Sequence, residues 1–415
     1  MINPPIKQLV MNTIKQSNAS TSYKYFDIGV NLIDPMYEGK YNGKQYHTCD
    51  IEAVLQRAER FGVQRMLLTG SSIHESLETI KLVQQYGTKY SFPLYYTVGV
   101  HPCCVNEFVT NGVSTIDKVT PVQYSEELLE KTKNLTRTKL KQLLDIWTQE
   151  SFSTGFKSIG EIGLDYDRLH YSDWNLQKWF FEQQLKLACI LNHNLTKSEN
   201  NLSKSSNVSP PPLFLHMRNC CDEFVEILQK FVTGFQDSVD FYNYKEWVEK
   251  KQSHEKLNSF TYKFPENQVF VVHSYTDGPS HVSDLLNLSP NVYIGFNGCS
   301  LRTPESIATV EKVDLARILV ETDAPWCEIK RSSASFEYVT ETVASLDTTI
   351  VSVKKDKYTK KLQDMNNNAN NIMVKGRNEP CNVNQVVEVI SKIKKLSYDH
   401  VANTIWETSL RIYEN

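Results

Sequence analysis

The sequence predicts an α/β fold, a closed (β/α)8 barrel that carries surface insertions. Eight short apolar segments have the composition of buried strands, and helix-like segments separate most of them. One or two further helices follow the eighth strand and can close the fold. A barrel of this kind needs about 250 residues. The surplus of the 415-residue chain is therefore assigned to an arm and to insertions.

The first half of the chain is expected to contribute four strands and four helices. The strands are expected at 25–32, 64–70, 94–100 and 156–161, where apolar and β-branched residues cluster. A helix is expected to begin after Asp50, a suitable N-cap, and to end at Gly62. The other helices are expected at 72–86, about 136–150 and 174–191.

The second half repeats this alternation. Its strands are expected at 213–216, 269–273, 291–296 and 318–323. Its helices are expected at 222–231, 278–287, 304–312 and 384–395, and a last helix has Trp406 and Leu410 on its apolar side. Pro304 is favourable in the first turn of the helix that it begins.

The remaining residues divide into an arm and four insertions around one domain. Residues 1–24 are rich in Ser, Asn and Lys and are expected to form a flexible N-terminal arm. Residues 25–415 are expected to form a single barrel domain. Its insertions are expected at about 103–135, 192–212, 234–266 and 333–375, where polar and low-complexity residues interrupt the pattern.

Composition and charge narrow the functional classes. The 45 basic and 48 acidic residues give a formal net charge of −3, so nucleic acid would have to bind through a local patch or through a metal ion. The nine cysteines include no Cys-x-x-Cys pair, and their odd number is typical of reduced thiols. Neither a secretory signal nor an apolar run of membrane-spanning length is visible. We expect a cytoplasmic or nuclear monomer without a membrane partner.

Four of the predicted strands end in side chains that commonly bind metal ions. Glu161 ends the fourth strand, His216 the fifth, His273 the sixth and Asp323 the eighth. Because strand ends converge on one face of a barrel, these side chains are expected to share a site for a divalent cation. Each residue alone would more simply be a hydrogen-bonded core residue. The repetition at four strand ends favours the metal site.

The predicted ligands are also candidates for catalysis. A bound cation lowers the pKa of a water molecule and polarises a phosphoryl or carbonyl oxygen. Asp323 suits a ligand that also accepts the proton of that water, and Glu161 can bridge two ions if two are bound. His101 ends the third strand on the same face, where it can contact a substrate oxygen or act as a general acid.

Two further residues are candidates for substrate binding. Arg218 follows the fifth strand, and its guanidinium can pair with a phosphate; a salt bridge inside the barrel mouth is an equally good interpretation. Trp326 can stack on a base or close the rim of the barrel. Asp165, Asp167 and Arg168 follow the fourth strand, and for Asp167 a structural ion-pair cluster is the simpler interpretation.

The motifs that contain these residues resemble those of the TatD family of metal-dependent deoxyribonucleases, a branch of the amidohydrolase-like barrels. No single motif is specific, but together they occur in the family's order over about residues 25–380. The matching motifs are Phe26-Asp-Ile-Gly-Val-Asn-Leu32, Gly99-Val-His-Pro102, Ile159-Gly-Glu-Ile-Gly-Leu-Asp165, Leu215-His-Met-Arg218, Val272-His-Ser-Tyr-Thr276, Tyr293-Ile-Gly-Phe-Asn-Gly298, Leu319-Val-Glu-Thr-Asp-Ala-Pro325 and Arg377-Asn-Glu-Pro380.

The resemblance implies a TIM-like, amidohydrolase-like barrel and Mg²⁺-dependent hydrolysis of phosphodiester bonds in DNA. Carried over residue by residue, it implies that Glu161, His216, His273 and Asp323 are metal ligands. It also implies that His101 lies near the substrate phosphate. Family members often act as 3′→5′ exonucleases, and endonuclease action is compatible with the same motifs. DNA is the expected partner.

One departure from the family pattern concerns the first strand. Many members carry Asp-x-His-x-His there, which supplies two imidazoles to a first metal site, whereas this chain has Asp27-Ile-Gly29-Val-Asn31. Part of the family shares this version, so activity can persist without the imidazoles. We expect a weakly held, exchangeable ion at one site. Mg²⁺ fits best, because it keeps several water molecules as ligands. Mn²⁺ and Zn²⁺ are alternatives, and a second ion can bind together with the substrate.

Three functions fit these observations. The first is a metal-dependent deoxyribonuclease with exonuclease or endonuclease action. The second is a metal-dependent hydrolase of another phosphoester, or of a cyclic amide or lactone, because substrate choice lies in the loops of a barrel. The third is a catalytically inactive scaffold that binds DNA or a partner. The intact set of predicted ligands argues against the third.

Overall fold

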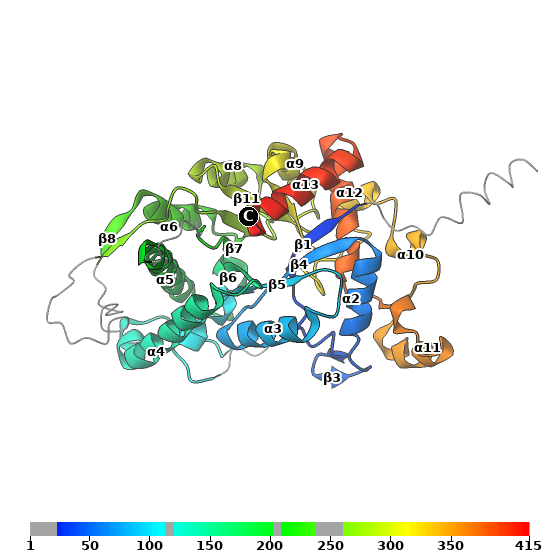
Figure 1. Ribbon diagram of the computed structural model, residues 1–415, viewed down its shortest axis with the longest axis horizontal. Helices are drawn as coiled ribbons and strands as arrows, with labels where there is room; N and C mark the ends of the chain where they lie inside the picture. Colours follow the sequence, from blue (N-terminus) through cyan, green and yellow to red (C-terminus); the bar gives the residue numbers. More distant parts are fainter. Residues whose placement is uncertain (1–22, 113–119, 202–208, 238–259, 415) are drawn as a thin grey trace, which may run out of the picture.

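The computed structural model has the predicted barrel and describes residues 23–112, 120–201, 209–237 and 260–414. Its main sheet contains eight parallel strands in the order β1-β4-β5-β6-β7-β10-β11-β12 (Figure 1). These are β1 (Tyr25–Val30), β4 (Val63–Leu68), β5 (Leu94–Val98), β6 (Phe156–Asp165), β7 (Leu213–Arg218), β10 (Phe270–His273), β11 (Val292–Phe296) and β12 (Ile318–Val320). Each predicted strand is confirmed, with small shifts at its ends.

The two edge strands of this sheet, β1 and β12, meet and close the barrel. Val30 and Ala324 form a parallel bridge just past β12. The Asn31 amide N–H donates to the Ala324 carbonyl at 2.8 Å, and the Asp323 N–H donates to the Gly29 carbonyl at 2.8 Å. The closure therefore brings the Gly29–Asn31 segment next to Asp323, which lies beyond the end of β12 although the sequence pattern places it within that strand.

Nine of the eleven α-helices in the described residues surround the sheet or end the chain, and the other two lie in the segment 333–375. The nine are α2 (Ile51–Arg60), α3 (Ile73–Tyr86), α4 (Glu126–Glu150), α5 (Trp174–Asn201), α6 (Cys221–Thr233), α8 (Pro279–Leu288), α9 (Pro304–Lys312), α12 (Val383–Lys394) and α13 (Tyr398–Tyr413). The side chains of Ser72, Ser125 and Thr303 cap α3, α4 and α9 by accepting a backbone N–H three residues further on. None of the described helices combines the length and apolar character needed to cross a bilayer.

The inside of the barrel is filled by a separate apolar cluster. Its strand residues are Phe26, Ile28, Leu67, Tyr95, Phe214, Val271 and Leu319. Ile412 and Tyr413, at the end of α13, complete it, and the Tyr413 ring lies 5.4 Å from that of Phe26. Because several of these residues lie near the beginnings of their strands, α13 covers the end of the barrel opposite to the strand C-termini (Figure 1).

Two segments predicted as irregular contain helix. The sequence predicts a long loop over 103–135, but a 3-10 helix covers Pro102–Phe108 and α4 already begins at Glu126. The first turns of α4 carry many exposed polar residues, which weakens the periodic pattern that marks a helix. Likewise α5 continues through 192–201. Residues 1–22, 113–119, 202–208 and 238–259 of the predicted arm and insertions lie outside the described residues.

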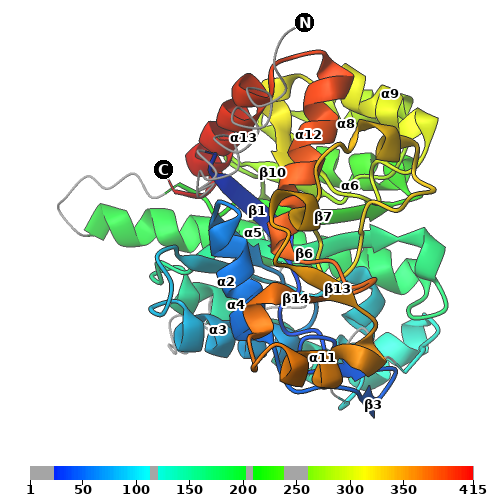
Figure 2. The same cartoon turned by 90° about the vertical axis from the view of Figure 1, so that its right-hand side faces the viewer.

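The segment 333–375 has regular structure of its own. It holds α10 (Val343–Leu346), β13 (Val351–Val353), α11 (Tyr358–Asp364) and β14 (Ile372–Val374), with β13 parallel to β14. Figure 2 shows α11, β13 and β14 on the side of the barrel that carries α2 and β3. Arg57 of α2 donates to the Ala369 carbonyl at 2.8 Å, and Lys355 lies 4.7 Å from the centre of the Tyr41 ring. The segment is thus fixed to the barrel.

The remaining short elements are pairs of strands and 3-10 helices. A hairpin pairs β2 (Lys40–Tyr41) with β3 (Lys44–Gln45), and β8 (Phe235–Asp237) forms an antiparallel pair with β9 (Phe260–Tyr262). The other 3-10 helices are η2 (Tyr166–Arg168), η3 (Leu315–Arg317), η4 (Ala334–Tyr338), η5 (Lys355–Lys357), η6 (Ala369–Asn371) and η7 (Pro380–Asn382).

Candidate metal centre

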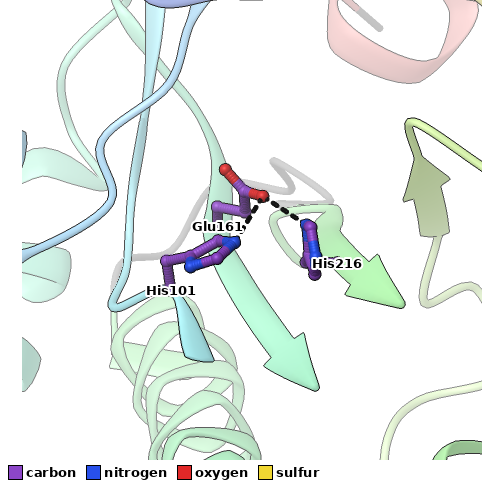
Figure 3. A group of neighbouring side chains, drawn as sticks. All are labelled: His101, Glu161 and His216. Carbon is purple, nitrogen blue, oxygen red and sulfur yellow. Dashed lines mark hydrogen bonds and ion pairs between the residues drawn. The ribbon is translucent and has the colours of Figure 1, made fainter. Parts of the chain in front are cut away.

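Glu161 occupies an irregular position in β6. Opposite β7, Gly160 pairs with Phe214 and Ile162 pairs with Leu215, so Glu161 is an extra residue in the register. A bulge of this kind bends a strand and re-aims the side chain of the inserted residue. The carboxylate of Glu161 consequently lies among imidazoles that come from the neighbouring strand ends (Figure 3).

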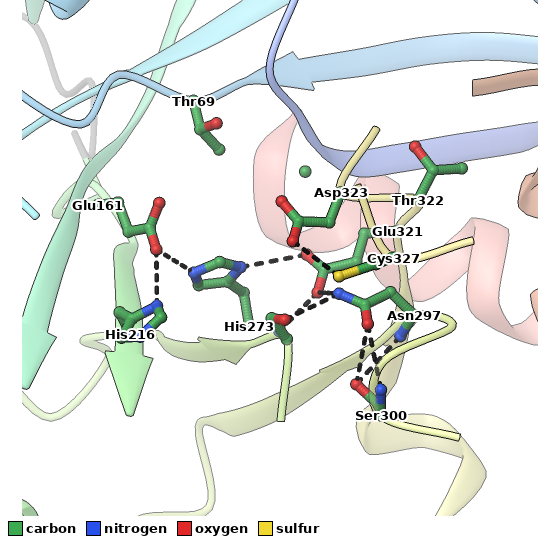
Figure 4. A network of polar contacts seen from close by, with 12 residues as sticks. Thr69, Glu161, His216, His273, Asn297, Ser300, Glu321, Thr322, Asp323 and Cys327 are labelled. Atoms are coloured by element: carbon green, nitrogen blue, oxygen red, sulfur yellow. Dashed lines mark hydrogen bonds and ion pairs between the residues drawn. The ribbon is translucent and has the colours of Figure 1, made fainter. Parts of the chain in front are cut away.

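One oxygen of Glu161 is approached by three imidazoles. Its Oε1 lies 2.8 Å from Nδ1 of His216, 2.7 Å from Nε2 of His273 and 3.3 Å from Nε2 of His101 (Figure 4 and Figure 3). All four side chains are buried. The potential ligand atoms of His101, Glu161 and His216 lie within 4.8 Å of one another. The structure therefore brings three of the four predicted ligands, Glu161, His216 and His273, together around one atom.

His216 lies between two carboxylates. Its Nε2 is 3.0 Å from Oδ2 of Asp165, the last residue of β6. Burial alone would raise the pKa of Asp165, but the hydrogen bond and charge of His216 outweigh burial and hold that pKa below its ordinary range. An ionised Asp165 accepts the proton on Nε2 and leaves the Nδ1 lone pair facing Glu161. His216 is thus prepared to bind a cation through Nδ1.

His101 has the opposite arrangement. Its Nδ1 accepts the backbone N–H of Cys103 at 3.0 Å, so the proton of the neutral ring lies on Nε2, the atom that faces Glu161. Burial lowers the pKa of His101 to about 3. A neutral ring with its proton on Nε2 donates a hydrogen bond and does not bind a metal ion. Of the two predicted roles, contact with a substrate oxygen is favoured over general acid catalysis.

Glu161 and His273 attract each other strongly. Burial opposes the charge of each group, but the charge of His273 holds the pKa of Glu161 well below its ordinary value. In turn, burial would lower the pKa of His273, and the charges of Glu161 and Glu321 raise it well above its ordinary value. A divalent cation can take the place of the proton between such a carboxylate and an imidazole, because metal ions and protons compete for the same lone pair.

Asp323, the fourth predicted ligand, lies on the other side of His273 (Figure 4). Its Oδ1 accepts a hydrogen bond from Nδ2 of Asn31 at 2.9 Å, and its Oδ2 lies 3.1 Å from the thiol sulfur of Cys327. Burial and the neighbouring Glu321 raise the pKa of Asp323. Within the described residues, Asp323 does not join the compact groups of potential ligand atoms around His101.

Gly29 stands at one of the two positions where the resemblance noted in the sequence implies an imidazole. A Cβ added to Gly29 would lie 2.5 Å from Oε2 of Glu321, a fully buried side chain. The space that a side chain at position 29 would need is therefore filled by the Glu321 carboxylate. A larger residue at position 29 would therefore have to displace that carboxylate.

The two predicted substrate contacts lie at the mouth of the barrel. Arg218 ends β7, pairs in register with Asp165 and is partly exposed. Its charge helps to lower the pKa of Asp165, although Arg168 is the residue whose Nε lies 3.7 Å from Oδ2 of Asp165. Trp326 is 46% exposed. The structure therefore leaves Arg218 and Trp326 accessible to a substrate.

The donor set fits a divalent cation. It offers a carboxylate oxygen and two imidazole nitrogens at 2.7–2.8 Å from that oxygen, and nitrogen and oxygen ligands suit Mg²⁺, Mn²⁺ and Zn²⁺ to different degrees. The second nitrogen of each imidazole faces a further carboxylate, Asp165 for His216 and Glu321 for His273. Such outer carboxylates orient metal-binding histidines.

Sequence reasoning missed several residues that build this centre. Glu321 lies behind His273 and Asn297 lies behind Glu321, both fully buried, and Asn31 contacts Asp323. Their sequence signal is weak, because a single polar residue near a strand end is usually a hydrogen-bonded core residue. Glu321 does carry one usable signal, since it lies two residues before Asp323 in an otherwise apolar strand end.

These features define a barrel hydrolase whose centre lies at the C-terminal ends of the strands. The chain matches the family described as TatD related DNase over residues 26–196 and 208–414. It belongs to that family and is a hydrolase acting on ester bonds.

Individual relatives agree with this assignment. The chain is 44% identical to a protein of Saccharomyces cerevisiae named deoxyribonuclease Tat-D, over 94% of this chain and 91% of the relative. It is 24% identical to a protein of Erwinia tasmaniensis named 3′-5′ ssDNA/RNA exonuclease TatD, over 72% of this chain and 80% of the relative. A crystal structure described as an uncharacterized amidohydrolase from Saccharomyces cerevisiae has a TM-score of 0.78 and 44% identity, covering 94% of this chain and 100% of that chain.

Proposed function

We propose that the chain is a divalent-metal-dependent deoxyribonuclease that hydrolyses phosphodiester bonds in DNA. One observation carries the metal dependence: Oε1 of Glu161 lies 2.8 Å from His216 Nδ1 and 2.7 Å from His273 Nε2 in a buried site. The choice of DNA is supported by the yeast relative that is named a deoxyribonuclease.

Glu161, His216 and His273 would hold the cation, with Asp323 approaching from the far side of His273. A bound divalent cation supplies Lewis acidity, which acidifies a water molecule and polarises a phosphoryl oxygen. We favour Mg²⁺, because it binds few protein ligands and keeps several waters. Mn²⁺ and Zn²⁺ are the alternatives that the same donor set admits.

The other residues of the centre act on the substrate and on protons. Asp323 accepts the proton of the attacking water, since burial raises its pKa above the ordinary value and Asn31 orients its carboxylate. His101 donates its Nε2 proton in a hydrogen bond to a phosphate oxygen. Arg218 pairs with a second phosphate oxygen, and Trp326 stacks on a base.

The direction of digestion is part of the proposal. The bacterial relative is named a 3′-5′ exonuclease, and we propose the same polarity for this chain. Endonuclease action is the alternative. The two give different products, because an exonuclease shortens a 5′-labelled strand stepwise from its 3′ end, whereas an endonuclease produces internal fragments from the start.

The test is digestion of 3′-labelled and 5′-labelled oligonucleotides by the wild type, by Asp323→Asn and by Asp145→Asn. Asp145 lies on the exposed face of α4 and serves as the matched control. Each protein is assayed with EDTA, Mg²⁺, Mn²⁺ or Zn²⁺. We expect cleavage by the wild type and the control only with metal, and a loss of at least about 100-fold in Asp323→Asn, the scale of a general base.

Two outcomes would overturn the proposal. Full activity of pure, folded Asp323→Asn would remove Asp323 from catalysis. If the wild type cleaves DNA with none of the three ions, DNA is rejected as the substrate. A panel of chromogenic phosphoesters, cyclic amides and lactones would then identify the ester or amide that is hydrolysed.

A further inference from the structure

Glu321 lies behind His273, on the side of the ring that faces away from Glu161. Its Oε1 accepts two hydrogen bonds, from the Ser274 backbone N–H at 2.5 Å and from Nδ2 of Asn297 at 3.1 Å. Its Oε2 lies 3.5 Å from Nδ1 of His273. Figure 4 shows the resulting row of side chains, from Asn297 through Glu321 and His273 to Glu161.

The two facing atoms of this row are buried, and neither has another hydrogen-bond partner. In the described part of the chain, neither Nδ1 of His273 nor Oε2 of Glu321 makes a hydrogen bond of ordinary length. Leaving a buried polar atom without a partner costs free energy. The two atoms are 3.5 Å apart. A small movement of either side chain would shorten this distance, turn the contact into an N–H···O hydrogen bond and remove the cost for both atoms.

We propose that Glu321 is a positioning residue that keeps the proton of the His273 ring on Nδ1 and thereby directs the Nε2 lone pair toward the cation. The inference rests on the proposed metal-dependent function. Asn297 and Ser274 hold Oε1, so that only Oε2 is free to face the ring. Asn297 is itself fixed, since its Oδ1 accepts the Cys299 backbone N–H at 2.8 Å.

The first strand contributes to this arrangement through Gly29. A Cβ there would lie 2.5 Å from Oε2 of Glu321, the same oxygen that faces His273. The missing side chain at position 29 thus provides the space in which Oε2 stands behind the imidazole. The Gly/Asn version of the first strand, which removes two ligands, leaves room for the carboxylate that orients a remaining one.

Glu321→Gln tests the proposal because the surroundings dictate how a Gln must lie. The amide oxygen must take the place of Oε1, where two N–H donors converge. The amide NH₂ then faces Nδ1 of His273 and can only donate to it. This substitution keeps the shape of the side chain but removes the acceptor that holds a proton on Nδ1, so that the ring keeps its proton on Nε2, the nitrogen that has to bind the cation.

The first measurement is a two-bond ¹H–¹⁵N correlation spectrum of the histidine rings without added metal, with His273 assigned by its loss in His273→Gln. We expect a proton on Nδ1 in the wild type and none on Nδ1 in Glu321→Gln. A merely structural role of Glu321 would leave the proton on Nδ1 in place. A wild-type His273 ring without a proton on Nδ1 overturns the proposal even if Glu321→Gln fails to fold.

The second measurement is a calorimetric titration with Mg²⁺ of the wild type, of Glu321→Gln and of Glu107→Gln, a buried glutamate outside the centre. Loss of an outer carboxylate weakens metal binding by about 10–100-fold, so we expect at least a tenfold weaker affinity in Glu321→Gln only. Unchanged affinity overturns the positioning role. If the wild type binds neither Mg²⁺ nor Mn²⁺ nor Zn²⁺, the proposed function fails, while the ring spectrum still decides the placement of the proton.

Discussion

At the scale of single residues, Asp323 shows how this centre differs from one built on paired imidazoles. Nδ2 of Asn31 donates to one of its oxygens, and the Cys327 thiol contacts the other. Hydrogen bonds from neutral groups therefore stabilise the Asp323 carboxylate. In a centre with two imidazoles on the first strand, a metal ion would neutralise this charge instead. Together with the space taken by Glu321 at position 29, this arrangement favours one exchangeable cation near Glu161 over a tightly held pair.

Gly29→Ala is expected to destabilise the protein by about 1–3 kcal/mol, the usual cost of forcing an extra group into a packed core. The reason is the 2.5 Å approach between the added Cβ and Oε2 of Glu321. Urea unfolding measures the effect. Gly112→Ala is the control, because nothing lies within 4 Å of a Cβ at that position. Equal stability changes in the two variants would contradict the crowding argument.

The buried carboxyl group of Glu107 is expected to make the stability of the protein depend on pH. Burial raises the pKa of its carboxyl from 4.5 to about 8, while the Ile73 backbone N–H that donates to it acts in the opposite direction. The folded state thus prefers the protonated form. The resulting stabilisation is complete below about pH 4.5 and is lost as the pH rises through 8. Between these two values the free energy of unfolding falls by about 1.4 kcal/mol for each step of one in pH.

Glu107→Gln should remove this loss, because a Gln keeps the acceptor for the Ile73 N–H and carries no charge. We expect wild type and variant to have similar melting temperatures at about pH 5. At about pH 9 the variant should melt at the higher temperature, since only the wild type has a carboxyl to ionise. A difference between the two proteins that stays constant over this range would show that Glu107 does not titrate differently in the folded and unfolded states.

At the scale of elements, β6 contributes most to the centre. It supplies Glu161 at its bulge and Asp165 at its end. It also approaches β7 closely at Gly163, which has φ of 150° and where a Cβ would lie 1.9 Å from the His216 carbonyl oxygen. The sequence predicts the strand from its apolar residues, but a bulge depends on the register with β7 and leaves little trace in the pattern of one strand.

Gly163→Ala should separate β6 from β7 and move Glu161 away from His216. We expect a loss of at least about 2 kcal/mol in the free energy of unfolding, because backbone strain and crowding add, together with weaker binding of Mg²⁺. Gly43→Ala has a positive φ of 74° and no atom within 4 Å of the new Cβ, so it isolates the strain. A Gly163→Ala protein that binds Mg²⁺ as the wild type does would argue against a role of this contact in the centre.

At the scale of the whole molecule, a buried ion network joins segments that lie far apart in the sequence. Arg377 pairs with Asp50 through two bonds of 2.7 Å and with Glu379 at 3.0 Å, and Glu379 pairs with Arg57 at 2.7 Å. Arg57 also holds the segment 333–375 through the Ala369 carbonyl. This network explains why a polar insertion is ordered against the barrel.

Glu379→Gln should destabilise the whole fold by about 3–5 kcal/mol, because it leaves a buried Arg57 without its charged partner. Glu337→Gln, at an exposed site in the same part of the molecule, is the matched control. Thermal unfolding followed by far-UV circular dichroism gives the comparison. Similar melting temperatures for the two variants would show that the network contributes little.

The barrel and the convergence of Glu161, His216 and His273 follow from local patterns, since buried strands are apolar runs and their ends share one face. Other features depend on contacts between distant residues. The hydrogen bond from Asn31 to Asp323, the Glu321 carboxylate behind His273 and the ion network around Arg377 arise only when the chain is closed. A pattern within one segment cannot reveal such partners.

The end of α13 has a consequence for how the protein is made. Tyr413 packs on Phe26 inside the barrel, and Ile412 lies beside it. A ribosome releases the first strand long before it has synthesised these two residues. The early strands must therefore remain without a complete interior until the last helix leaves the exit tunnel, so a nascent chain stalled before Ile412 should be captured by chaperones that bind exposed apolar segments.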